Sequence, residues 1–186
     1  MSTNNNNNNN NNNKINKQIL ITVGTTKFEK LIKSIDEESF YYFFDNLKFT
    51  KMIIQKGKGE YIPTKFQNIK LENLKVEVHE LLPNFENIIK ESEYIISHAG
   101  AGIILESLKN KKKVFVVVND SLMDNHQIEL AFSLEKDNYV FYVKYPENIV
   151  SEVKDTITNI DSKNWKEYPD IDYEIIPNVI YEMMNL

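Results

Sequence analysis

Two glycines separated by a single alanine, Gly100 and Gly102, stand in the stretch ISHAGAGIILE near the middle of the sequence. An apolar run precedes them and a helical pattern follows, so they occupy a predicted strand-to-helix turn. Such a turn can bring backbone N–H groups and a helix N-terminus against an anion, usually a phosphate. The glycines can equally do no more than permit a tight turn with close helix–sheet packing. The pattern alone favours neither interpretation.

An acidic residue, Glu106, follows Gly102 by four positions. Its carboxylate could accept two hydrogen bonds from a ribose diol, as acidic residues do in other nucleotide sites. A solvated helix acid stabilised by the helix dipole is the more common use of such a residue. The dinucleotide fingerprint would need a third glycine near Leu105, and none is present. A nicotinamide enzyme is therefore not expected.

Polar side chains also crowd the start of a later predicted helix, at Asp124, Asn125, His126 and Gln127. Asp124 is a good N-cap, which explains one of the four. The other three could hydrogen-bond a polyhydroxylated ligand, for which amide and imidazole groups are suited. They could equally form a solvated first turn.

Gly24, Thr25 and Thr26 end the first predicted strand. The two hydroxyls can bond phosphate oxygens or cap the following helix, and one can cap while the other contacts a ligand. His98, just before the glycine turn, could act as a catalytic base. It has no Asp or Ser partner at a useful spacing, so a structural histidine that supports the glycine turn is the favoured interpretation.

These residues must be positioned by elements that alternate along the chain. The patterns predict strands at 17–23, 51–59, 74–81, 94–97, 113–119 and 139–143, and helices from Phe28, within 40–47, 84–93, 102–110 and 124–138, and from Glu147. Such alternation predicts an α/β fold, a Rossmann-like, mostly parallel sheet with flanking helices. Ligands of such sheets bind outside the carboxyl ends of the strands, where the three polar loops would meet.

Composition limits the alternatives. The chain of 186 residues has no cysteine, which excludes disulfides and thiolate sites, and its three histidines lack metal-ligand spacing. The net charge is −5, and the short run Lys111–Lys113 is expected to mark a turn before a buried strand. Because nucleic-acid binding needs a sustained basic face, no nucleic-acid partner is predicted. No apolar run approaches the ~20 residues that cross a bilayer.

The two ends of the chain differ from the middle. An unbroken asparagine run, Asn4–Asn13, predicts a disordered leader over 1–15. Residues 16–186 are expected to form one Rossmann-like domain with a C-terminal helical tail. After Pro177 the tail carries an apolar stripe, which either docks a partner or covers the chain's own core: Val179, Ile180, Met183 and Met184.

Three segments, ITVGTTKFEKLI, IISHAGAGIILESL and VFVVVNDSLMDNHQIELA, follow one another with a specific order and spacing. Together they resemble the soluble catalytic subunits of the two-chain UDP-N-acetylglucosamine (UDP-GlcNAc) transferases that build dolichol-linked oligosaccharide. The resemblance extends from about Ile19 to Tyr142. The bacterial transferase that adds GlcNAc to the lipid-linked peptidoglycan precursor is similar, and it carries both halves of the enzyme in one chain.

The resemblance implies the C-terminal, donor-binding half of a GT-B glycosyltransferase. Its family transfers GlcNAc from UDP-GlcNAc to dolichyl-diphospho-GlcNAc with inversion, adding the second GlcNAc of the lipid-linked oligosaccharide for protein N-glycosylation. A non-enzymatic nucleotide-sugar-binding or scaffold protein of the same fold is the alternative.

The motifs then imply roles for particular residues. The turn Gly100-Ala101-Gly102 would approach the diphosphate, with His98 beside it, and Glu106 would approach the ribose. Asn125, His126 and Gln127 would face the sugar and diphosphate, with Gln127 the best candidate for a GlcNAc hydroxyl. Gly24, Thr25 and Thr26 would lie on the rim facing the missing half.

The same resemblance implies what else the reaction needs. No Asp-x-Asp cluster stands at these loops, so UDP-GlcNAc would be bound as donor substrate with no metal or cofactor. A membrane-anchored subunit would supply the acceptor-binding half and the general base. The chain would then be cytoplasmic and recruited to the cytosolic face of the endoplasmic reticulum.

Overall fold

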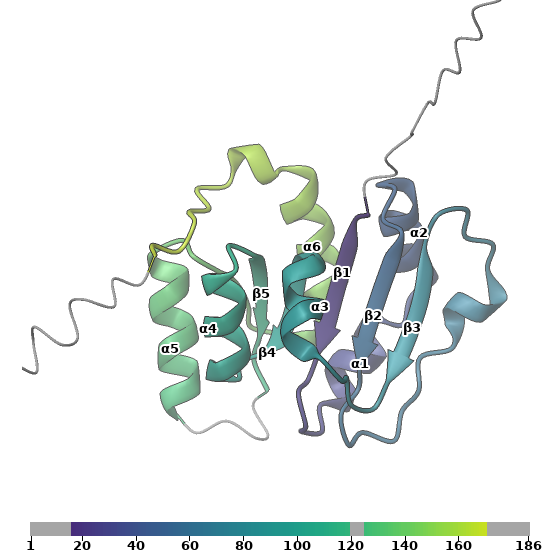
Figure 1. Ribbon diagram of the computed structural model, residues 1–186, viewed down its shortest axis with the longest axis horizontal. Helices are drawn as coiled ribbons and strands as arrows, with labels where there is room; N and C mark the ends of the chain where they lie inside the picture. The colour runs from purple at the N-terminus through teal and green to yellow at the C-terminus, as the bar shows by residue number, and fades with distance from the viewer. Residues whose placement is uncertain (1–15, 120–124, 171–186) are drawn as a thin grey trace, which may run out of the picture.

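A fully parallel six-stranded sheet forms the centre of the protein, with strand order β3-β2-β1-β4-β5-β6 (Figure 1). The computed structural model describes residues 16–119 and 125–170, with only the backbone described for 125–128. The strands are β1 (Gln18–Thr22), β2 (Lys51–Gln55), β3 (Lys75–His79), β4 (Ser92–His98), β5 (Lys113–Val117) and β6 (Phe141–Val143). The predicted Rossmann-like architecture is confirmed.

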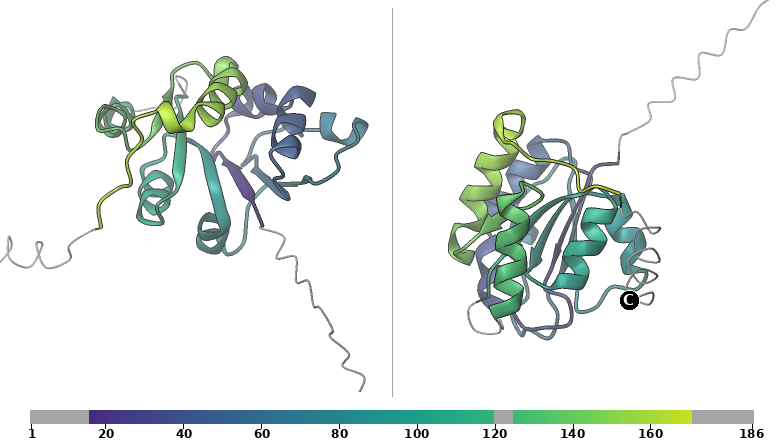
Figure 2. Two further views of the ribbon diagram at one scale, coloured as in Figure 1. Left: turned by 90° about the horizontal axis from the view of Figure 1, so that it is seen from above. Right: turned by 90° about the vertical axis from the view of Figure 1, so that its left-hand side faces the viewer.

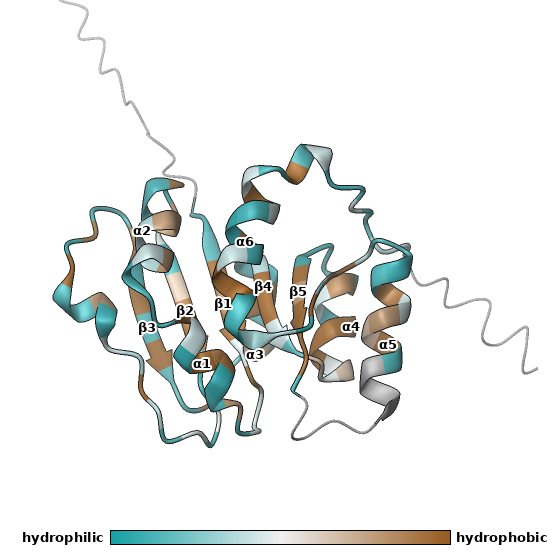
Figure 3. Ribbon diagram, turned by 180° about the vertical axis from the view of Figure 1, so that it is seen from behind, coloured by the Kyte–Doolittle hydropathy of each residue, from teal (hydrophilic) through white to brown (hydrophobic). Residues whose placement is uncertain are grey.

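The central strands are apolar on both faces. Every residue of β1 is buried, and β5 is buried from Val114 onward. A strand that is covered on both faces needs a continuous apolar run, unlike the alternating pattern of a half-exposed strand. Figure 3 shows the resulting apolar colouring through the middle of the sheet.

Helices cover both faces of the sheet, as the views along and across it show (Figures 1 and 2). One face carries α1 (Glu29–Ile35), α2 (Glu38–Asn46) and α6 (Ile149–Thr158); the other carries α3 (Phe85–Glu91), α4 (Ala101–Lys109) and α5 (Asn125–Lys136). The largest hydrophobic cluster lies under the first group. Two smaller clusters lie under the second.

Two buried aspartates hold the long connection from 56 to 74, where the structure has only a short 3-10 turn, η1 (Lys65–Asn68). Asp36 accepts hydrogen bonds from the hydroxyls of Tyr41 and Tyr61, both at 2.7 Å, and from two backbone N–H groups. Asp45 accepts from three successive backbone N–H groups, at 2.7–3.2 Å. The sequence analysis assigned neither residue a role, because an isolated aspartate carries no signal of its distant partners.

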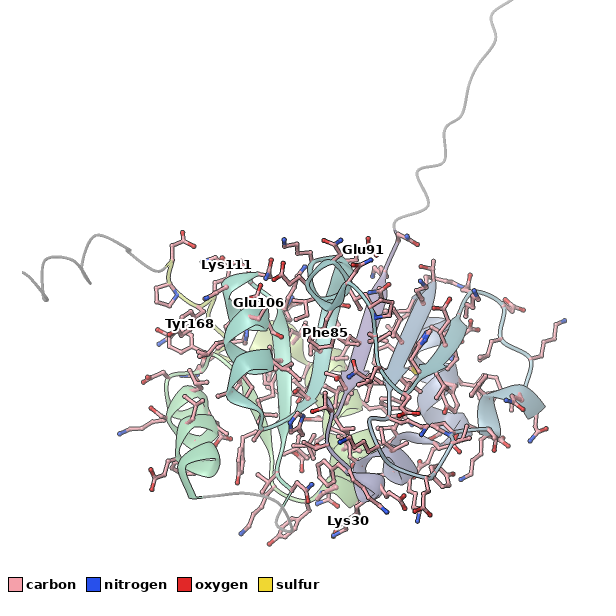
Figure 4. The ribbon with its side chains drawn as sticks, turned by 60° about the horizontal axis from the view of Figure 1, so that its bottom comes forward. Lys30, Phe85, Glu91, Glu106, Lys111 and Tyr168 are labelled. Atoms are coloured by element: carbon pink, nitrogen blue, oxygen red, sulfur yellow. The ribbon has the colours of Figure 1, made fainter. Side chains whose placement is uncertain are left out.

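The segment 163–170 passes the amino ends of β5 and β6, where Lys111 and Lys113 of the lysine run contact it. Lys111 has a left-handed φ of 57°, and β5 begins two residues later, so the predicted turn before a buried strand is confirmed. The Lys111 ammonium also donates to the Tyr168 carbonyl at 2.6 Å and pairs with Asp170 at 2.7 Å. Figure 4 shows Lys111 and Tyr168 together at this end of α4.

The remaining sequence predictions concern the ends of the chain and membrane crossing. The predicted leader, 1–15, and the apolar stripe of the predicted tail lie outside the described residues. Among the helices that are described, none is long and apolar enough to span a bilayer.

Candidate functional site

A cavity of about 490 Å³ opens outside the carboxyl ends of β1, β2, β3 and β4. Seven of the eleven predicted site residues line it: Gly24, Thr25, Thr26, His98, Gly100, Ala101 and Gly102. The rest of its lining is Gln55 and an apolar group of Leu81, Leu82, Phe85 and Ile103. A polar glycine-rich wall thus stands beside an apolar wall in one cavity.

Hydrogen bonds to Gly24 and Thr26 fix the turn after β1. Gly24 has a left-handed φ of 62°, its N–H donates to the Thr22 hydroxyl at 3.0 Å, and its carbonyl accepts from the Gln55 amide at 2.8 Å. The Thr26 hydroxyl donates to the Val23 carbonyl at 2.8 Å. Thr26 therefore serves the turn itself.

Neither threonine caps a helix. Helix α1 begins at Glu29, with Phe28 at its N-cap position and no side-chain cap, so the helix-capping interpretation of Thr25 and Thr26 is wrong. Thr25 is exposed on the cavity, and its side chain has no hydrogen-bond partner in the described part of the chain. Of the two hydroxyls, that of Thr25 is the one available to a ligand.

The His98 ring explains two of the glycines. A Cβ atom on Gly24 would stand 3.0 Å from His98 Cε1, and one on Gly100 would stand 2.7 Å from His98 Nε2. The second distance is shorter than real Cβ contacts allow, and the first is tight at a left-handed φ of 62° that already favours glycine. These glycines are needed to accommodate the ring, which supports the packing interpretation for them.

Gly102 is different. A Cβ atom there would meet nothing within 4 Å, and the residue lines the cavity. Packing does not require a glycine at this place, and a glycine near a helix start is less favourable than alanine. The packing interpretation therefore applies to Gly100, which makes room for the His98 ring. The ligand interpretation fits Gly102, which leaves open space beside the cavity.

His98 is held as a neutral ring. Burial lowers its pKa, although the Thr22 carbonyl acts in the opposite direction, and no carboxylate contributes to the shift. Its Nδ1 atom is buried without a hydrogen-bond partner among the described residues. A neutral imidazole has one donor and one acceptor nitrogen, and Nε2 is the one that faces the glycine turn. The contacts of the ring with Gly24 and Gly100 fit a histidine that supports this turn.

The N-terminus of α4 faces the same cavity. Gly100 is its N-cap and offers no side chain to the first-turn amides, while the Gly100 N–H is already used by the His98 carbonyl at 2.7 Å. The first N–H groups of a helix lack intrahelical partners and carry the positive end of the helix dipole. Ala101, Gly102 and Ile103 line the cavity, so their amides could bind an anion there.

The remaining predicted residues lie apart from this lining. Glu106 is half-buried on α4 and accepts a hydrogen bond from Asn110 at 3.1 Å; Figure 4 shows it on α4, with Phe85 on the neighbouring α3. Asn125, His126 and Gln127 form the first turn of α5, as predicted, and their side chains lie outside the described residues, as does Asp124. Their ligand roles remain predictions.

Sequence reasoning missed Gln55 and the apolar wall. Leu81, Leu82 and Phe85 follow β3, and Gln55 ends β2, so the expected meeting of loops at the carboxyl edge could have indicated them. Across residues 16–119 and 125–170, no group of three His, Asp or Glu side chains is placed to hold a metal ion.

Residues 18–176 match the glycosyltransferase family 28 C-terminal domain. The chain belongs to this family. Over 126 residues it is 36% identical to the human UDP-N-acetylglucosamine transferase subunit ALG13, a match that covers 68% of this chain and 11% of the human protein. The chain therefore spans about a tenth of the length of that relative.

Solved structures agree with the family 28 assignment. An NMR solution structure of ALG13 superposes with a TM-score of 0.58 at 26% identity, covering 83% of this chain and 90% of that one. The crystal structure of MurG from Acinetobacter baumannii gives a TM-score of 0.57 at 19% identity, covering 77% of this chain and 42% of that one. The latter supports the fold alone: this family 28 domain corresponds to part of a GT-B glycosyltransferase.

Proposed function

We propose that this chain is the catalytic, donor-binding subunit of a UDP-GlcNAc:dolichyl-diphospho-GlcNAc N-acetylglucosaminyltransferase, which adds the second GlcNAc of the lipid-linked oligosaccharide. Membership of family 28 and the printed name of the human relative support the proposal. The observation that carries it is the cavity where the bare N-terminus of α4 and the open Gly102 face an apolar wall. Those two walls are complementary to a diphosphate and to a nucleobase.

The donor's diphosphate is bound at the α4 N-terminus. There the first-turn amides and the neutral His98 donate hydrogen bonds, and the helix dipole stabilises the negative charge that grows on departing UDP. This electrostatic preorganisation favours the transition state over the bound substrate. It needs no metal or cofactor, which is part of the proposal.

The rest of the donor is held by side chains on both sides of that turn. Glu106 accepts the ribose hydroxyls, and Asn125, His126 and Gln127 bind the sugar and diphosphate, with Gln127 on a GlcNAc hydroxyl. In the transfer, the acceptor hydroxyl loses its proton to the general base and attacks the anomeric carbon from the side opposite to UDP, so that UDP departs with inversion.

A membrane-anchored partner supplies the acceptor site and the general base. The relatives are named as transferase subunits, which supports a second polypeptide. Dolichyl-diphospho-GlcNAc is a membrane lipid, so such a partner would bring this chain to the cytosolic face of the endoplasmic reticulum. Nucleic acid is not among its ligands.

The test is a transfer assay on membranes in which the chain is co-expressed with the membrane subunit of a two-chain transferase. Labelled GlcNAc should pass from UDP-GlcNAc to a dolichyl-diphospho-GlcNAc acceptor, and Glu106→Ala and Gln127→Ala should each reduce the rate by about tenfold or more. Unchanged rates in both variants would contradict the site assignment. Binding of UDP-GlcNAc without any transfer would favour the non-enzymatic alternative.

A further inference from the structure

One cavity residue, Gln55, has a side chain that is placed by the fold and is not used by the reaction proposed above. It ends β2, is only 4% exposed, and lines the cavity from beneath the turn after β1. Its Nε2 group donates to the Gly24 carbonyl at 2.8 Å, and its own backbone carbonyl accepts from the Val23 N–H at 3.1 Å. Gln55 therefore holds two successive residues of the turn.

The other end of this amide is unsatisfied. Gln55 Oε1 and His98 Nδ1 are the two buried side-chain polar atoms that lack a hydrogen-bond partner among the described residues, and both belong to this cavity. Buried polar groups are nearly always paired, since an unpaired one is destabilising. The stability of the turn explains the paired Nε2 end of this side chain but not the unpaired Oε1 end.

The bond to Gly24 controls the neighbouring peptide group. In a trans peptide the carbonyl of Gly24 and the N–H of Thr25 point in opposite directions, so fixing one fixes the other. Glycine at a φ of 62° has little intrinsic resistance to a rotation of that peptide. The Thr25 N–H has no partner in the part of the chain that the structure describes, and Thr25 lines the cavity.

We propose that Gln55 is a positioning residue for the nucleotide sugar: through the Gly24 carbonyl it aims the Thr25 N–H and hydroxyl at the donor's phosphate oxygens. This inference rests on the proposed function, because it needs a diphosphate in the cavity. Gln55 itself does not touch the reacting atoms.

A matched control exists in the same sheet. Gln18 begins β1, is 5% exposed, and donates to Ser92 Oγ at 3.0 Å and to the Ile88 carbonyl at 3.2 Å. It is as buried as Gln55 and bonds similarly, but it lies at the amino edge of the strands, away from the cavity. Methionine has nearly the same shape as glutamine and cannot make these bonds.

The experiment compares the full chain with its Gln55→Met and Gln18→Met variants, using UDP as the probe. Calorimetry measures UDP affinity, urea unfolding measures stability, and amide hydrogen exchange reports on Gly24, Thr25 and Thr26 without ligand. Gln55→Met should weaken UDP binding by about tenfold and speed exchange at the turn, whereas Gln18→Met should change affinity less than about twofold. Both variants should lose stability.

Each other outcome has a distinct meaning. If wild type binds UDP and Gln55→Met binds it equally well, or if Gln18→Met weakens binding as much, the positioning role is wrong. If wild type does not bind UDP, the proposed function fails, and unchanged exchange at Thr25 in Gln55→Met would separately refute control of the turn. Should Gln55→Met not fold, Gln55→Leu, which is also uncharged and also lacks the N–H donor, decides by the same measurements.

Discussion

Substituting alanine for Gly102 should change stability and ligand binding in opposite directions. The new Cβ atom would meet no protein atom within 4 Å, and Gly102 lies in the first turn of α4. Alanine is favoured over glycine in helices by up to about 1 kcal/mol, and the Cβ also restricts the unfolded chain. We therefore expect Gly102→Ala to raise the free energy of unfolding by about 0.5–1 kcal/mol.

In the proposed site, the same methyl group would stand where the diphosphate approaches the backbone. Preventing one close amide–phosphate contact, a hydrogen bond to a charged group, should weaken UDP binding by about 1.5–3 kcal/mol, or roughly tenfold to a hundredfold. Urea unfolding and titration calorimetry on one preparation measure both effects. The signature is a more stable protein that binds its ligand less well.

Two other glycines supply the contrast. A Cβ on Gly57 would lie 2.1 Å from the Thr26 carbonyl at a left-handed φ of 59°, so Gly57→Ala should destabilise the fold. Gly100→Ala, which presses on His98, should lower both stability and binding. If Gly102→Ala bound UDP as wild type does, or if it unfolded more easily, the assignment of its open space to the ligand would be refuted.

Three further changes test the site and the framework. Glu106→Ala should weaken binding of UDP about tenfold but leave that of 2′,3′-dideoxy-UDP nearly unchanged, since the carboxylate is proposed to accept from both hydroxyls of the ribose diol; equal losses for both ligands would contradict that role. Burial would raise the pKa of Asp45, but the hydrogen bonds from the backbone N–H groups of Asn73, Leu74 and Glu72 outweigh it, and the pKa is lowered. The ionised Asp45 therefore stabilises the fold above about pH 4, and this contribution is lost as pH falls through the lowered pKa. Asp45→Asn should thus lose about 2 kcal/mol at pH 7 and show a flatter stability profile in acid, measured by urea unfolding from pH 2 to 7. Lys111→Ala should lower stability by less than about 1 kcal/mol, because its pair with the exposed Asp170 is solvated, and calorimetry should show unchanged UDP affinity.

The fold could be predicted because the sequence repeats one simple signal. Apolar runs such as that of β5 are too short for bundle helices and too continuous for half-exposed strands, which indicates a parallel sheet. What could not be predicted is the connection from 56 to 74. Its conformation depends on Asp36 and Asp45, whose partners within the connection stand 25 to 29 residues away in the chain and follow no period.

The polar half of the site could also be predicted, because glycines and hydroxyls at strand ends are rare enough to notice. The individual roles could not. Gly100 and Gly102 are the same residue type two positions apart, yet only the position of the His98 ring shows that one is needed for packing and the other leaves open space. The Thr26 hydroxyl likewise is used by a carbonyl three residues back, which no capping rule indicates.

The apolar wall shows where sequence reasoning ends for a cavity of this kind. Leu82 and Phe85 contact the core cluster under α3 while also lining the cavity, so in sequence they resemble ordinary core residues. Leu81, between the same strand and helix, is 54% exposed and has no such packing to explain it. Single exposed apolar residues are common on protein surfaces, but Leu81 lies beside Leu82 and Phe85 and extends one apolar wall of the cavity, which a bound ring could cover. Within the proposed function the nucleobase provides that cover, so the apolar wall binds the nucleobase and the polar wall binds the diphosphate.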